Sequence, residues 1–162
     1  MTETTPPVLG GLLTAALTDP KLKGLVAHVG DDSLHVTGID QTRSWATAAL
    51  ARETPVLLVT ATGHEAEDLT AELTALLGDH KVGHFPAYET LPHERLSPAA
   101  DIVGRRAKVL WEMPQVIVAA ARAACQPVLQ PGEPVRVEVD QERDFEDLTR
   151  QLTHFAYKHV DM

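Results

Sequence analysis

The chain of 162 residues carries 14 lysines and arginines against 23 aspartates and glutamates, and its net charge of −9 argues against non-specific phosphate binding as its main task. Aromatic residues make up only 4% of the sequence, too few for a row of base-stacking platforms, and the single cysteine, Cys125, excludes a disulfide framework and a cysteine-based zinc site. No apolar run approaches the ~18 residues of a membrane span and the polar amino terminus is unlike a signal peptide, so we expect a cytoplasmic protein without a membrane partner.

The first fifty residues predict two helices separated by a short hairpin. Residues 1–7 offer nothing to bury, which predicts a disordered tail. Leucines and alanines at helical spacing predict a helix over 8–17 that ends before Pro20. Two β-rich runs flank a Gly-Asp-Asp turn, and an alanine-rich helix follows them; these three segments are 24–29, 33–37 and 41–52.

The middle of the chain alternates strands with helices. Residues 55–60 and 115–121 are continuous apolar runs, typical of strands buried on both faces. Leucines on one face and acidic residues in the first turn predict a helix over 63–78. A short strand and another helix complete the series, at 82–85 and 99–113. This order predicts an α/β fold in which helices cover both faces of a parallel sheet.

The pattern changes at residues 127–134, where three prolines and a glycine indicate a domain boundary. Alternating valines then predict a half-solvated strand at 135–139, and Asp144 has the position of a helix N-cap. The helix that follows would turn three apolar side chains inward, namely Phe145, Leu148 and Leu152. We therefore expect an α/β domain over 8–128 and the beginning of a small α+β domain over 129–162, too short to be stable alone.

One segment, residues 35–42, has the position of a nucleotide-binding P-loop, between a β-rich run and a helix. The pattern G-x-x-x-x-G-K-[ST] is nearly lost there, since His35 and Asp40 replace the glycines and Gln41 replaces the lysine. The positions of this degenerate loop are His35, Gly38, Asp40, Gln41 and Thr42.

These replacements remove the chemistry that holds a phosphate. A carboxylate at Asp40 would repel the phosphates, and Gln41 brings no positive charge to the γ-phosphate. The apolar strand at 115–121 also runs into Arg122 without an acidic residue that could hold a metal. An ordinary strand-to-helix turn explains the segment as well, so we expect no catalytic residue, no bound nucleotide and no metal in this chain.

The long connection over 86–98 contains three prolines and leads into a charged cluster. Such a loop either carries an interface or packs over the sheet as scaffold. The cluster could fix the loop to the next helix through ion pairs, which is the interpretation that we favour, or could face a partner; its members are Arg95, Asp101, Arg105 and Arg106.

Several motifs in and beyond this loop resemble a known family. Tyr-Glu-Thr-Leu-Pro at 88–92, followed by Ser-Pro-x-x-Asp-Ile at 97–102 and by Arg106, is similar to the amino-terminal region of the bacterial transcription-repair coupling factors (Mfd). Pro-Val-Leu-Gln at 127–130 and Tyr-Lys-His-Val-Asp at 157–161 are similar to that family too. The first module of the family resembles the excision-repair subunit UvrB, and residues 36–42 keep the register of its P-loop.

The resemblance implies a fragment of an ATP-dependent DNA translocase, a helicase-like hydrolase that displaces stalled RNA polymerase and recruits UvrA for nucleotide excision repair. ATP, Mg²⁺, DNA and the polymerase would bind to other domains of the parent protein. Residues 8–128 would begin the UvrB-like core, and 129–162 would begin the inserted UvrA-binding domain. The family's UvrA-contact motif is absent here, so no UvrA contact is assigned and binding should be weak or absent.

Two other interpretations remain open from the residues alone. One is a P-loop ATPase fragment with an aberrant loop, and the other is an unrelated acidic interaction domain. Lysine and glycine at positions 41 and 40 would have favoured the ATPase, and the chain has neither.

Overall fold

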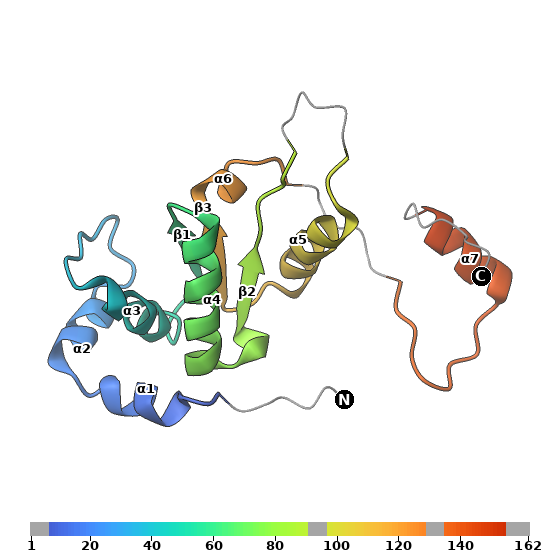
Figure 1. Ribbon diagram of the computed structural model, residues 1–162. Helices are drawn as coiled ribbons and strands as arrows, with labels where there is room; N and C mark the ends of the chain where they lie inside the picture. Colours follow the sequence, from blue (N-terminus) through green and yellow to red (C-terminus); the bar gives the residue numbers. More distant parts are fainter. Residues whose placement is uncertain (1–6, 91–96, 129–134, 155–162) are drawn as a thin grey trace. The chain divides into compact units, whose positions relative to one another are not determined.

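The computed structural model describes residues 7–90, 97–128 and 135–154, and a parallel sheet of three strands lies at the centre of the part that ends at residue 128 (Figure 1). β3 (Val116–Ala120) is the middle strand, between β1 (Val56–Thr60) and β2 (Val82–Phe85). Val116 is in register with the first residue of each neighbour, Val56 and Val82. The predicted parallel sheet is therefore confirmed, with its two fully apolar strands side by side.

Helices cover the sheet on both faces because alternate residues of β3 point to opposite sides. Val116 and Val118 pack in one cluster with the leucines of α4 (Gly63–Leu77), while Ala119 packs in another with Val109 of α5 (Ala100–Glu112). The short helix α6 (Ala121–Ala124) continues directly from β3. The α/β class predicted from the alternating pattern is confirmed.

Both ends of α4 are fixed by local chemistry. The Thr62 hydroxyl accepts the Glu65 amide at 3.2 Å, and the Glu65 carboxylate reaches back to the Ala61 amide at 3.1 Å, an arrangement close to a capping box. The helix ends at Gly78, whose φ of 94° is a conformation that glycine adopts without strain. A short 3₁₀ turn, η2 (Asp79–Lys81), then leads into β2.

The amino-terminal part packs against α4 as a set of helices. α1 (Gly10–Ala16) places Leu13 in the core at 2% exposure, and the Leu9 amide donates to the Ala75 carbonyl at 2.8 Å. After a 3₁₀ turn, η1 (Asp40–Thr42), α3 (Arg43–Leu50) buries Thr47 and Ala48. The helices predicted over 8–17 and 41–52 are thus present in shorter form.

The predicted hairpin over 24–37 is wrong. Residues Pro20–Ala27 form helix α2, because Asp19 accepts the Lys21 amide at 2.7 Å as its N-cap and Pro20 occupies the first turn. Residues 33–37 form no strand, since no neighbouring segment offers them a ladder.

β1 lies at one edge of the sheet, and one of its faces is open. Val56 and Leu58 pack against the core, whereas Leu57 and Val59 on the other face are 61% and 49% exposed. Within the described parts of the chain, β1 therefore has both an exposed apolar face and an outer side with no paired strand, a combination that favours pairing with another strand.

The chain divides into two compact units at residues 129 and 130, and the second unit is described here by itself. It contains α7 (Phe145–His154), which has the predicted N-cap: the Asp147 amide donates to Asp144 at 2.8 Å. The strand predicted at 135–139 is absent, and no residue described in this unit is buried. Among the described residues of this unit the alternating valines have no strand to pair with, and Phe145 is 78% exposed.

Two predictions fall largely on residues that the structure does not describe: the tail over 1–7 and the centre of the loop over 86–98. Among the described residues, no helix combines the length and the apolar character needed to cross a membrane.

Candidate functional site

The loop-like segment 35–42 leads into α3 without a strand before it. Residues 33–39 are irregular, and the exposed side chains of Val36 and Ile39 lie outside the core. A P-loop depends on a strand and a helix that hold its backbone amides around a phosphate. That frame is incomplete here. The segment was predicted to lie between a strand and a helix; the helix, α3, is present, but the strand before it is not.

The remaining hydroxyl of the P-loop pattern is used within the segment itself. Thr42 Oγ1 donates to the Ile39 carbonyl at 2.6 Å, and the Thr42 amide donates to the same carbonyl at 2.9 Å. Gly38 lies against this turn, where an added Cβ would be 3.3 Å from Thr42 Oγ1. The hydroxyl that would bind a metal in a P-loop thus closes a turn.

Arg43 brings the starts of α3 and α4 together. Its guanidinium donates to the Glu65 carboxylate and, at 3.1 Å, to Asp40. The hydrogen bond from Arg43 lowers the pKa of Glu65, and the same bond raises the pKa of the Arg43 guanidinium. The helix ends that could attract a phosphate are therefore lined by two carboxylates paired with the protein's own arginine.

The end of β3 offers no metal ligand either. Ala120 leads directly into α6, where Arg122 donates to the Glu89 carbonyl at 3.5 Å. Within the described ranges, no group of three or more histidines, cysteines, aspartates or glutamates is arranged to hold a metal ion. His84, in β2, is half-buried, and this burial lowers its pKa.

The charged cluster at the start of α5 separates into two arrangements. Arg105 donates to Asp101 at 2.8 Å on the exposed side of the helix, and this hydrogen bond lowers the pKa of Asp101. Arg106 instead points into the protein and is only 2% exposed. Arg95 lies outside the described residues.

Arg106 joins three segments of the chain. Its guanidinium stacks between the rings of Phe85 and Tyr88, at 3.9 and 4.1 Å from their centroids. It donates to the carbonyls of Pro86 at 2.7 Å and Pro127 at 3.2 Å. Two aromatic faces and two carbonyls thus replace the carboxylate partner that buried arginines usually have.

Gln126 holds the same loop from the other side. Its amide group accepts the Tyr88 backbone amide at 2.7 Å and donates to the Tyr88 carbonyl at 3.1 Å, as a neighbouring strand would. Glu89 then accepts the Ala99 amide, which ties the two ends of the loop together. The described parts of the loop are therefore fixed to the segment after α6 and to the start of α5.

Sequence reasoning missed both the burial of Arg106 and the role of Gln126. The first had a signal, because Arg106 follows Ile102 by four residues and precedes Val109 and Leu110 by three and four, which places it on the apolar face of α5. Nothing local distinguishes Gln126, whose partner is 38 residues away.

Comparison with known proteins decides the relationship. The chain is 38% identical over 170 aligned residues to the transcription-repair-coupling factors of Mycobacterium tuberculosis and Mycobacterium bovis, and the match covers 95% of the chain. The chain is homologous to one region of the transcription-repair-coupling factors. The factor of Bacillus subtilis is 30% identical over 130 aligned residues, 74% of the chain. No family model matches the chain.

The matched region is a small part of these relatives. It covers 14% of the two mycobacterial factors and 11% of the factor from Bacillus subtilis. The resemblance carried by the motifs at 88–92 and 97–102 is confirmed by this match.

Replacing Arg106 tests whether its contacts hold the loop in place. We expect Arg106→Met to lower the free energy of unfolding by about 2–4 kcal/mol, because two carbonyls lose their donor and two rings lose the stacked cation. Arg105→Met, one residue away and exposed, should change it by less than about 1 kcal/mol. Urea denaturation measures both, and an Arg106→Met protein as stable as the wild type would contradict the role given to Arg106.

Proposed function

We propose that this chain is a non-catalytic scaffold module of a transcription-repair-coupling factor. The similarity to those factors supports the parent protein that we propose. The loss of the phosphate-binding glycines and lysine from the loop over 35–42 supports a module without catalysis. The observation that carries the proposal is the pairing of Arg43 with Glu65 and Asp40 at the starts of α3 and α4. The positive charge nearest to the loop is thus neutralised by the protein's own carboxylates.

In the parent protein we propose the activity that the family resemblance implies. The whole factor would use ATP to move along DNA, displace stalled RNA polymerase and recruit UvrA to the lesion. These steps belong to other domains, where ATP and Mg²⁺ would bind. The low aromatic content and net charge of −9 support a region that does not itself hold DNA.

The open edge of β1 supports the scaffold role. A parallel sheet is normally covered on both faces, yet Leu57 and Val59 are largely exposed beside unpaired backbone groups. We propose that β1 adjoins a further part of the UvrB-like core in the parent protein. Residues 7–128 would then supply one side of a larger sheet.

For the second unit, only the family resemblance supports a role in UvrA recruitment. α7 is strongly amphipathic in sequence, and Phe145 is exposed at its start. We propose that 129–162 begins the inserted domain that binds UvrA, which the parent protein holds masked against its other domains.

Nucleotide binding tests the non-catalytic assignment. Titration calorimetry of the chain with Mg-ATP should give no binding at 100 µM protein, because no backbone cradle and no free cation faces the phosphates at this segment. The Gln41→Lys variant should also fail to bind, since Asp40 and the Arg43–Glu65 pair remain. A micromolar dissociation constant for either protein would contradict the proposal.

Binding to UvrA tests the assignment of the second unit. We expect the 162-residue chain to bind purified UvrA weakly or not at all. No side chain described in 135–154 is buried, so this segment has no packed core to hold a binding surface in place, and ordering it on binding would cost free energy. Surface plasmon resonance with immobilised UvrA measures this. Nanomolar capture would show that the UvrA-binding surface is already complete in this chain.

A further inference from the structure

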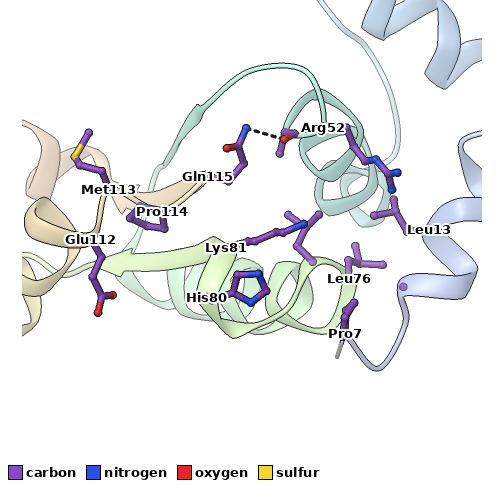
Figure 2. A pocket seen from close by; sticks show the side chains of 13 residues that line it. Pro7, Leu13, Arg52, Leu76, His80, Lys81, Glu112, Met113, Pro114 and Gln115 are labelled. Carbon is purple, nitrogen blue, oxygen red and sulfur yellow. Dashed lines mark hydrogen bonds between the residues drawn. The ribbon is translucent and has the colours of Figure 1, made fainter. Parts of the chain in front are cut away.

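A cavity of about 660 Å³ lies at the amino-terminal edge of the sheet, apart from the segment and loop described above (Figure 2). Lys81 and Gln115, which line it, immediately precede β2 and β3. Gln115 also donates to the Ala51 carbonyl at 2.8 Å, which connects this edge to the end of α3. The cavity therefore lies at a junction of fixed backbone segments.

The floor of the cavity is apolar and belongs to the core. Leu13, Leu76 and Leu77 line it, and each is buried in the main cluster. α1 and α4 supply these side chains, so the floor is part of the packing that holds both helices on the sheet.

Met113, on the rim, has two unfavourable features. It is 66% exposed, and its φ of 44° is in the left-handed region, where a helix normally ends on glycine. The following Pro114 is wedged against Gly83, where an added Cβ would be 2.7 Å from Pro114 Cγ. The chain thus holds a large apolar side chain in a costly conformation at the edge of an apolar floor.

Three basic side chains surround this floor. Arg52 follows α3, and His80 and Lys81 precede β2 (Figure 2). Across the described parts of the chain, none of the three has an ion pair or a side-chain hydrogen bond. Glu112 is the carboxylate among the lining residues, and Lys108 is 3.9 Å from it.

The ends of nearby helices explain only part of this arrangement. α3, α4 and α5 all end near the cavity, and basic groups are favourable beside the partial negative charge of helix carboxyl ends. That effect accounts for the sign of the charges. It does not account for the exposed Met113 or for the hollow above Leu13 and Leu76.

We propose that this cavity binds an acidic peptide segment: its carboxylates pair with Arg52 and Lys81, and an apolar side chain between them rests on Leu13 and Leu76 beside Met113. Charge complementarity favours this occupant, because Arg52, His80 and Lys81 line one cavity and none of them has a carboxylate partner among the described residues. The apolar floor favours a peptide over a nucleic acid backbone, which would need a longer basic surface. This proposal does not depend on the proposed function.

The probe is an acetylated and amidated octapeptide of alternating aspartate and leucine, titrated into the ¹⁵N-labelled 162-residue chain. We expect saturable amide shifts at residues 52, 76–81, 113 and 115. The Arg52→Gln, Lys81→Gln double variant should bind about tenfold more weakly, since two charged contacts are lost. The matched control, Lys21→Gln with Lys23→Gln, removes two exposed charges of α2, which does not line the cavity, and should bind as the wild type does.

Two further probes separate charge from shape. The peptide with asparagine in place of aspartate should lose most of its affinity, and so should the peptide with serine in place of leucine. Equal binding of either peptide, shifts confined to other residues, or equal loss in the control variant would overturn the proposal. Competition tests the choice of occupant. If inorganic phosphate or a DNA duplex displaced the labelled aspartate–leucine peptide at a lower concentration than the unlabelled peptide does, an acidic peptide would be the wrong occupant.

Discussion

The burial of β3 on both faces is the constraint on which the first unit depends. Its backbone is hydrogen-bonded to β1 on one side and β2 on the other, and its apolar side chains alternate between the two faces of the sheet, so neither face at β3 can stay in water. α4 must then cover Val116 and Val118, and α5 must cover Ala119. α1 and α3 then pack against α4, and the connections between the strands lie at the two ends of the sheet.

Positively charged side chains have different surroundings at the two ends of the parallel strands. At the carboxyl ends of the strands, Arg43 is neutralised by Glu65 and Asp40, and Arg106 is enclosed by aromatic rings and carbonyls. These arginines hold segments together and leave little for a phosphate to bind. At the amino-terminal edge, Arg52 and Lys81 lie beside an apolar hollow without such partners among the described residues. At the end that resembles a nucleotide site, the arginines are therefore paired with groups of the protein itself, whereas at the opposite end Arg52 and Lys81 line a cavity.

The sequence predicted those parts of the fold that depend on neighbouring residues in the chain, and it failed where distant segments had to meet. Continuous apolar runs predicted β1 and β3, and leucine spacing with caps predicted α4, because burial on two faces or one leaves a clear pattern. Residues 33–37 and 135–139 have the alternation of strands but find no partner strand, and strand preference depends on such partners. Pro20 indicated only the end of one helix, although Asp19 and Pro20 begin the next. The loss of phosphate-binding groups was readable at Asp40 and Gln41, whereas the contacts of Gln126 and the gathering of Arg52 with Lys81 required the fold.

Residue-resolved amide hydrogen exchange most directly tests the claim that residues 7–128 fold around β3 independently of 135–154. Amides of β3 should exchange about 10³-fold or more slowly than an unfolded chain, because they open only with the whole unit. Amides of α7 should be slowed by less than about tenfold, since a helix of ten residues with no buried side chain is marginal in water. Protection of residues 148–154 equal to that of β3 would contradict this account, and so would rapid exchange at residues 116–120.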